Sequence, residues 1–195
     1  EPSMIGMLSP MTFLMIFIAP ALTMRLVSEE LRQGTHELLF TAPIRDWEII
    51  VGKWLAVWAV FTVFVLLTAI LPIILVSRGN PDVGQILTGY LGLWLLGGAS
   101  LAVGIFASSL TQYQLVAFMV TMAVLVFLQV AQGLSSVFQS ATVRDIFTEV
   151  SLTRHYDSLV YRAVIDPLDI AYFIGMMAIF LFLATQMLST RRWSA

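Results

Sequence analysis

The sequence predicts an all-α integral membrane protein, a polytopic helical bundle. Apolar residues make up 59% of its 195 residues and charged residues only 11%, whereas soluble domains carry about 45–50% and about 25%. So few charges cannot cover a water-facing surface. The long apolar stretches are apolar on every face, while barrel strands alternate apolar and polar residues, so helices are favoured over a β-barrel. The net charge of −2 also argues against a basic nucleic-acid-binding face.

Five stretches are long enough to cross a hydrocarbon core, which takes roughly 20 apolar residues per helix. In chain order they are residues 4–24, 47–77, 85–107, 115–134 and 169–190. The third and fourth belong to one uncharged stretch, 83–143, which is too long for a single span and is expected to turn at the polar run 108–114. Pro10, Pro20 and Pro72 predict kinks, because proline removes a helix hydrogen bond.

The third span carries small residues at four-residue spacing, namely Ser100, Gly104 and Ser108. Small residues let membrane helices approach closely, so these positions predict a helix-packing seam and a span that is buried against protein. Gln129 and Gln132 lie one turn apart in the fourth span. Because amides are costly in lipid, we expect these two side chains to line a pathway.

The polar segment 25–46 is expected to fold rather than to act as a linker. Gly34 predicts a helix stop, and Thr35 can cap a new short helix with Glu37 in its first turn. Pro43 then ends that helix, because the residue before proline is driven out of the α region. Asp46 is expected to cap the second span. Two interpretations stay open: a solvated connector, or a rigid charged helix on the membrane surface that another protein can move.

The segment 135–168 predicts two short amphipathic helices, because its apolar residues recur at helical spacing around Ile146 and again around Leu159. They are interpreted either as interfacial helices that cap the bundle or as an outer gate. His155 is expected at the surface, as are the acids Asp145, Glu149, Asp157, Asp166 and Asp169. The sequence has no cysteine, and His36 is expected on the side opposite His155, so no metal site is predicted.

Several motifs resemble those of ABC type-2 transporter permeases. The first cytoplasmic loop of that family is matched by Glu30, Gly34, Thr35, Glu37, Leu38, Leu39, Thr41, Pro43, Gly52 and Lys53. The turn at 107–117, which includes Gln112, is similar to the family's second cytoplasmic turn. The stretches 155–158, 162–166 and 191–193 resemble the branch of gliding-motility and copper-enzyme-maturation permeases.

The resemblance implies the permease subunit of an ATP-driven exporter, located in the bacterial inner membrane. It implies a coupling helix at 36–41 that docks on a separate ATPase subunit, where ATP and Mg²⁺ are bound. The coupling residues would be Glu30, Gly34, Thr35, Glu37, Leu38, Leu39, Pro43 and Gln112. The expected partners within the membrane are a second permease, the same or a related chain, and the membrane lipid. An extracytoplasmic partner protein is a further candidate. A non-transporting anchor or scaffold subunit is the alternative.

The chain has no Gly-x-x-x-x-Gly-Lys phosphate-binding loop, so ATP hydrolysis is expected elsewhere and the chain is not expected to be an enzyme. The family also implies six spans with a cytoplasmic start, and thus one span before residue 4. Basic residues are more frequent on the side that holds Arg25, Arg32, Arg45, Lys53, Arg191 and Arg192 than on the side that holds Arg78, Arg144, Arg154 and Arg162. This small excess, six against four, favours the first side as the cytoplasmic one.

Overall fold

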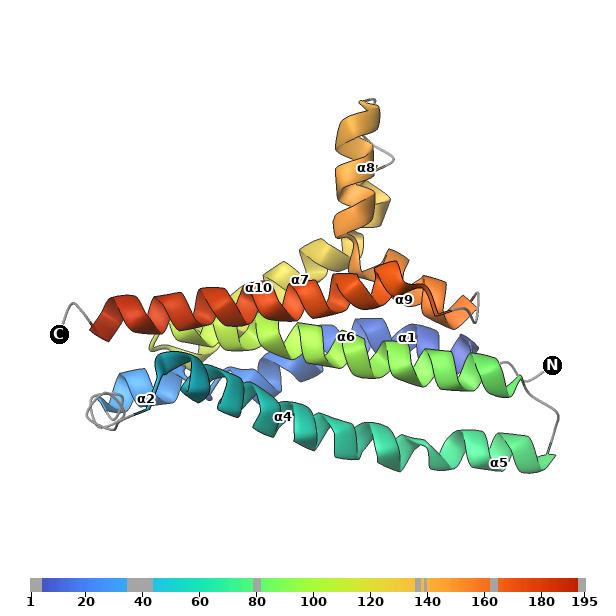
Figure 1. The fold of residues 1–195 in the computed structure, drawn as a ribbon, viewed down its shortest axis with the longest axis horizontal. Coiled ribbons are helices and arrows are strands. Elements are labelled where there is room, and N and C mark those ends of the chain that lie inside the picture. Colours follow the sequence, from blue (N-terminus) through green and yellow to red (C-terminus); the bar gives the residue numbers. More distant parts are fainter. Residues whose placement is uncertain are drawn as a thin grey trace.

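The structure is a computed structural model that describes residues 5–34, 44–78, 82–135, 138, 140–161 and 165–192. Every regular element in these ranges is a helix, as predicted. The helices are α1 (Ile5–Thr23), α2 (Ser28–Gln33), α4 (Asp46–Thr68), α5 (Ile70–Arg78), α6 (Val83–Leu110), α7 (Gln114–Ser135), α8 (Ala141–Val150), α9 (Leu152–Tyr161) and α10 (Pro167–Arg192). The long helices run side by side (Figure 1).

Five segments of the described residues are long and apolar enough to cross a membrane, the number that the sequence predicts. They are Pro10–Gln33, Asp46–Ile74, Val83–Leu110, Gln114–Ser135 and Pro167–Arg191. Their bounds extend the predicted third and fifth spans by a few residues at each end. The longest difference is in the first segment, which continues through a turn into α2.

Helix α6 is the centre of the bundle. Of the residues in its most apolar stretch, 83% are buried inside the structure. The corresponding share is 22–44% in the other four spans. Glycines let the neighbouring helices approach α6 closely. A Cβ atom on Gly97 would lie only 2.0 Å from Phe61 Cε1 of α4, and one on Gly104 would lie 2.0 Å from Thr23 Oγ1 of α1. The burial expected for this span from its small residues is therefore observed.

The second span is broken near Pro72, in agreement with the predicted kink. Helix α4 ends at Thr68 and α5 begins at Ile70. Proline at position 72 has no N–H group to bond the carbonyl of Thr68, and the hydroxyl of Tyr90 on α6 donates to that carbonyl instead, at 2.9 Å. By contrast, α1 continues through Pro10 and Pro20, so the predicted kinks there are not seen as breaks.

The two amphipathic helices predicted in 135–168 are α8 and α9. Helix α9 packs into the bundle: Tyr156 is fully buried and its hydroxyl donates to the carbonyl of Leu8 at 2.9 Å. Helix α8 has no buried residue and projects away from the bundle, crosswise to the long helices (Figure 1). It is attached to α7 through an edge contact between Phe147 and Phe127.

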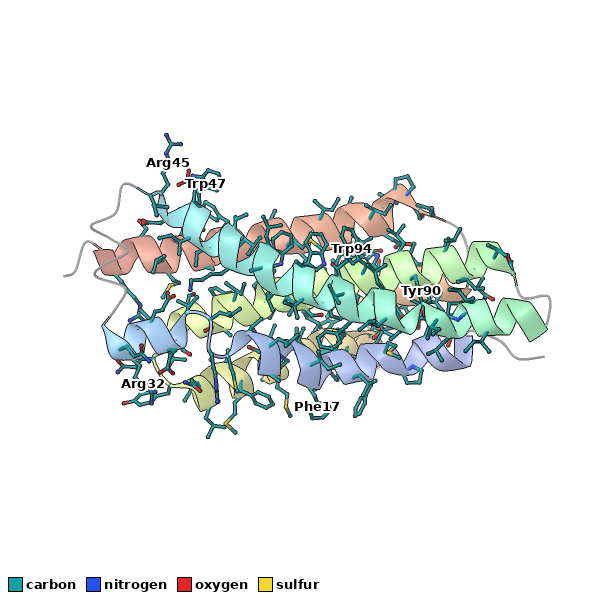
Figure 2. The ribbon with its side chains drawn as sticks, turned by 90° about the horizontal axis from the view of Figure 1, so that it is seen from below. Phe17, Arg32, Arg45, Trp47, Tyr90 and Trp94 are labelled. Carbon is teal, nitrogen blue, oxygen red and sulfur yellow. The ribbon has the colours of Figure 1, made fainter. Side chains whose placement is uncertain are left out.

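The bundle has two distinct ends. At one, named here the α2 end, α2, the start of α4, the turn between α6 and α7, and the end of α10 lie together. Figure 2 shows Arg32, Arg45 and Trp47 there, and Tyr90 toward the opposite end. That opposite end, named the α9 end, holds α9 and the start of α10.

Candidate functional site

The α2 end is built around a break between α1 and α2. Residues 24–27 form a turn, and Val27, which precedes α2, offers no side-chain cap. Ser108 of α6 supplies the cap: its hydroxyl oxygen accepts from the backbone N–H groups of Val27 at 3.1 Å and Ser28 at 3.0 Å, and donates to the carbonyl of Met24 at 3.2 Å. One buried hydroxyl thereby uses its whole hydrogen-bonding capacity on the break.

A lysine on α4, Lys53, also bonds the break between α1 and α2. The ammonium of Lys53 donates to the carbonyl of Leu26 at 2.7 Å and forms an ion pair with Glu30 of α2 at 2.5 Å. The two charged side chains are only 21% and 31% exposed. A six-residue helix is too short to be stable alone, so contacts of this kind hold α2 in place.

Glu29 connects α2 to α7. Its carboxylate accepts from Arg32 and Gln33 within α2, each at 2.6 Å, and from the side-chain amide of Gln114 at the start of α7. Helix α10 joins the same end, because Arg191 donates to the carbonyl of Leu110, the last residue of α6, at 2.9 Å. Helix α2 is therefore attached to three spans, α4, α6 and α7.

An open groove of about 780 Å³ lies at this end, between α2 and the turn from α6 to α7. Its polar lining comes from Arg25, Glu29 and Arg32 on one side and from Gln112 and Gln114 on the other. Tyr113 and Leu115 at its rim are strongly exposed. The groove combines both charge signs with exposed apolar side chains, as protein-binding surfaces do.

The structure places three of the residues predicted to couple to an ATPase at the α2 end. Glu30 is the partner of Lys53, Gln112 lines the groove, and Gly34 ends α2 in the left-handed conformation with φ 71°. That conformation favours glycine, as the predicted helix stop requires. The others lie outside the described residues: Thr35, Glu37, Leu38, Leu39 and Pro43.

One local expectation at this end is wrong. Asp46 does not cap the second span but is the first residue of α4, and Arg45 takes the cap position. The backbone N–H of Arg45 donates to the Glu48 carboxylate at 3.0 Å. The Glu48 carboxylate in the first turn thus reaches back to the cap residue. This contact satisfies a free N–H group at the helix start, as a cap does.

Three stacked tryptophans continue from Lys53 into the bundle. Trp54 stacks on Trp58 with ring centroids 4.5 Å apart, and Trp58 stacks on Trp94 of α6 at 4.2 Å. Each indole N–H is satisfied: Trp54 donates to the carbonyl of Gly98, Trp58 to that of Trp94, and Trp94 to the Thr62 hydroxyl. The start of α4 is therefore fixed to α6 by directed contacts.

At the α9 end, His155 is buried, which corrects the expectation of a surface histidine. Its side chain is 8% exposed, and its Nδ1 lies 2.7 Å from Oδ1 of Asp169, whose side chain is 9% exposed. The ring stacks on Tyr172 with centroids 3.9 Å apart. Nε2 lies 3.0 Å from the carbonyl oxygen of Glu149. The fold brings these residues together because α9 packs beside the start of α10.

Four of the five acids expected to be scattered also meet here. Glu149, Asp157, Asp166 and Asp169 line one cavity of about 420 Å³, together with Arg154. Burial raises the pKa of the Asp157 carboxyl above its ordinary value. Among the residues that the structure describes, no group of three or more His, Asp or Glu side chains is placed to hold a metal ion.

The two glutamines predicted to line a pathway differ in their surroundings. Gln132 is exposed and lines the cavity at the α9 end. Gln129 is half-buried, and its backbone carbonyl accepts from the Thr153 hydroxyl of α9 at 3.1 Å. The two side chains are thus not brought into one described cavity.

The predicted packing seam contains three different environments. Gly104 lies against Thr23, and Ser108 makes the hydrogen bonds at the break described above. Ser100 is buried and its hydroxyl makes no hydrogen bond in the described part of the chain. Sequence reasoning missed the roles of Ser108 and Glu29, because hydrogen bonds between residues more than 80 positions apart leave no local pattern.

The comparisons with known proteins agree with the fold. The family described as ABC-2 family transporter protein matches residues 3–192, nearly the whole chain. A search among curated proteins gives no match. The match covers all five spans as well as both ends of the bundle. The chain therefore belongs to the ABC-2 family of transporter membrane proteins.

Proposed function

We propose that this chain is the permease subunit of an ATP-driven exporter and that a separate ATPase docks at its α2 end. ATP and Mg²⁺ are held by that ATPase, and a second permease, identical or related, completes the pathway. The α2 end faces the cytoplasm of a bacterial inner membrane, since it carries most of the basic residues, among them Arg25, Arg32 and Arg45. The gliding-motility and copper-enzyme-maturation branch is the proposed place within the family.

The observation that carries the proposal is the attachment of α2 to three spans. Lys53, Ser108 and Gln114 come from α4, α6 and α7, and each bonds α2 or the break before it. A displacement of α2 by an ATPase would therefore reach three spans at once. Packed helices with directed bonds pass on a rigid-body movement, which a loosely held loop would absorb.

The coupling helix proposed at 36–41, with Glu37, Leu38 and Leu39, follows directly on α2. Thr35 at its start and Pro43 at its end are part of the same proposed contact. Gly34 bounds α2 on that side, and Arg45 and Glu48 begin α4 on the other. The proposed contact is thus flanked by two helices that are both fixed in the bundle. Gln112 in the groove is the second proposed contact with the ATPase.

The test is ATP hydrolysis by the reconstituted complex of permeases and ATPase in lipid nanodiscs. Lys53→Glu places two carboxylates opposite each other at Glu30, so we expect a several-fold lower permease-dependent hydrolysis rate with no change in the isolated ATPase. The swap Lys53→Glu with Glu30→Lys should recover part of the rate. The matched control is Arg144→Glu, a charge reversal at an exposed position of α8, away from the α2 end. Equal rates in all four complexes would reject the coupling role.

The alternative, a non-transporting anchor or scaffold, is distinguished in the same experiment. A scaffold would bind the ATPase stably without altering its hydrolysis rate, even as the wild-type chain. A transporter subunit changes the rate when it binds, because the movement of α2 is part of the hydrolysis cycle.

A further inference from the structure

The cavity at the α9 end carries more acidic than basic side chains. Four of the residues that line it are carboxylic acids, and the residues that can offset their charge are Arg154 and His155. Arg154 forms an ion pair with Glu149 of α8, and Nδ1 of His155 lies 2.7 Å from Oδ1 of Asp169. Even when both Arg154 and His155 are counted as cations, two acids in the described lining have no counter-charge. The cavity therefore attracts positively charged groups.

The two remaining acids are Asp157 and Asp166. Asp157, on α9, is half-buried, and burial raises the pKa of its carboxyl above the ordinary value. A bound cation offsets this effect, because an opposite charge favours the ionised form. Asp166 precedes α10, and its Oδ1 accepts from the backbone N–H of Leu168 at 2.9 Å. Acidic side chains are commonly hydrated, so this charge by itself does not specify a ligand.

One oxygen of Asp169 is both buried and unpaired. The Asp169 side chain is 9% exposed, and its Oδ2 makes no hydrogen bond within the described part of the chain. Burial of a carboxylate oxygen without a donor is costly, because the oxygen is withdrawn from water with no compensating bond. Since Asp169 is one of the residues that line the cavity, a ligand with hydrogens to donate would remove that cost when it binds there.

His155 fixes the orientation of the Asp169 carboxylate. Oδ1 is held by the contact with Nδ1, and the imidazole ring stacks on Tyr172 with centroids 3.9 Å apart. Nε2 of the same ring lies 3.0 Å from the carbonyl oxygen of Glu149. The carboxylate is thereby kept from rotating freely, so Oδ2 is preorganised to accept from a ligand.

These contacts narrow the chemistry of the cation. Among the described residues, no three His, Asp or Glu side chains are placed to hold a metal ion. A guanidinium binds best across both oxygens of a carboxylate, but Oδ1 of Asp169 is already in contact with His155. A quaternary ammonium has no N–H group for Oδ2 to accept. A primary ammonium fits, because it combines a positive charge with three N–H donors that point in different directions.

The cavity lies where two spans end. Leu168 and Asp169 are in the first turn of α10, Gln132 is in the last turn of α7, and all three line the cavity. In a membrane the ends of spans lie at the headgroup region, which both lipid headgroups and dissolved molecules reach. An aminophospholipid such as phosphatidylethanolamine and a water-soluble amine both carry a primary ammonium group.

We propose that this cavity of about 420 Å³ binds a primary ammonium group, which donates to Oδ2 of Asp169 and is balanced in charge by Asp157 and Asp166. The site has no residue in common with the groove at the α2 end. It therefore does not depend on the proposed ATPase docking, and its binding is measured on the full chain without the ATPase.

The two sources of the ammonium group are distinguished in nanodiscs. In nanodiscs of mixed phosphatidylethanolamine and phosphatidylcholine, preferential retention of phosphatidylethanolamine by the extracted chain, detected by native mass spectrometry, assigns the site to a lipid headgroup. In nanodiscs of phosphatidylcholine alone, saturable binding of radiolabelled ethanolamine without any such lipid preference assigns it to a soluble amine. Either result supports the site, and the absence of both would overturn it.

Choline tests the proposed hydrogen bond separately from the charge. It is a cation of similar size with no N–H group, so an excess of choline should not displace the bound ethanolamine or phosphatidylethanolamine. Displacement by choline as effective as displacement by ethanolamine would show that the cavity only attracts cations, and would overturn the assigned contact with Oδ2.

Three substitutions of the same kind test the residues. Asp169→Asn should weaken ammonium binding about tenfold, because a hydrogen bond to a charged group is lost. Asp157→Asn leaves the contact between His155 and Asp169 in place and should weaken binding several-fold. The control Asp145→Asn removes an exposed acid of α8 that is not among the lining residues, and should leave binding unchanged. Unchanged binding in Asp157→Asn, or an equal loss in all three variants, would overturn the proposal.

Discussion

Lys53 and Glu30 form an ion pair of 2.5 Å between α4 and α2, and the ammonium also bonds the Leu26 carbonyl at 2.7 Å. One side chain thus fixes both the break after α1 and the helix that follows it. Neither charge is fully exposed to solvent, so the pair is screened less than a surface pair.

Removing the lysine should destabilise the α2 end. Lys53→Ala leaves Glu30 and the Leu26 carbonyl without this partner in a half-buried place, and we expect a loss of about 1–3 kcal/mol in the free energy of unfolding. The measurement is chemical unfolding in mixed micelles. The matched control is Arg32→Ala, whose ion pair with Glu29 involves an arginine side chain that is 59% exposed and should contribute less than about 0.5 kcal/mol. Equal losses in both variants would contradict this assignment.

Ser108 and its neighbour Ser109 offer a direct comparison. Both are buried, but Ser108 bonds the break before α2, whereas Ser109 donates only to the Phe106 carbonyl of its own helix at 2.7 Å. Ser108→Ala should cost about 1–3 kcal/mol, because two buried N–H groups lose their acceptor. The amides of Val27 and Ser28 should then exchange with deuterium faster. Ser109→Ala should leave their exchange unchanged, and faster exchange in both variants would show that Ser108 is not the cap.

Gly104 should not tolerate a methyl group. A Cβ atom there would lie 2.0 Å from Thr23 Oγ1, so Gly104→Ala must push α1 away from α6, at a cost of about 1–3 kcal/mol. Apart from its two chain neighbours and the backbone of its own helix, a Cβ atom on Gly175 of α10 would meet no atom of the described residues within 4 Å. Gly175→Ala should therefore be neutral or slightly stabilising. Thermal unfolding of both variants tests the difference, and a stable Gly104→Ala protein would disprove the close contact.

The tryptophan stack should connect α4 and α6 energetically. Trp58→Leu removes two stacked contacts and one hydrogen bond to the carbonyl of Trp94, for a loss of about 2–4 kcal/mol. Trp47, which is 49% exposed at the start of α4, is the control. Trp47→Leu should change the free energy of unfolding by less than about 0.5 kcal/mol. A comparable loss in the two variants would mean that the stack contributes little.

The spans could be predicted from the sequence because their signals are local. Hydrocarbon thickness sets the length of an uncharged stretch, and Pro72 and Gly34 act through their own backbones, so the break and the helix stop fell where expected. The burial of α6 followed from its small residues. Pro10 and Pro20 show the limit of such signals, because the helix around them continues.

The two clusters at the ends of the bundle could not be predicted in the same way. His155 and Asp169 are 14 residues apart and meet only because α9 folds back onto α10, so each separately had the pattern of a surface residue. Ser108 had the spacing of a packing residue, and its bonds to Val27 and Ser28 depend on where α1 ends. Tertiary contacts of this kind are decided by the fold and not by neighbouring residues.

Site-directed photo-crosslinking of the assembled complex tests the central claim most directly. A photoreactive residue is placed at Arg32 or Gln112, which line the groove at the α2 end, or at Ile146 on α8 as the control. The account predicts ATPase adducts from Arg32 and Gln112, with yields that change between the ATP-bound and nucleotide-free states, and no ATPase adduct from Ile146. An intact complex in which the ATPase reacts only with Ile146, or with none of these positions, would contradict it.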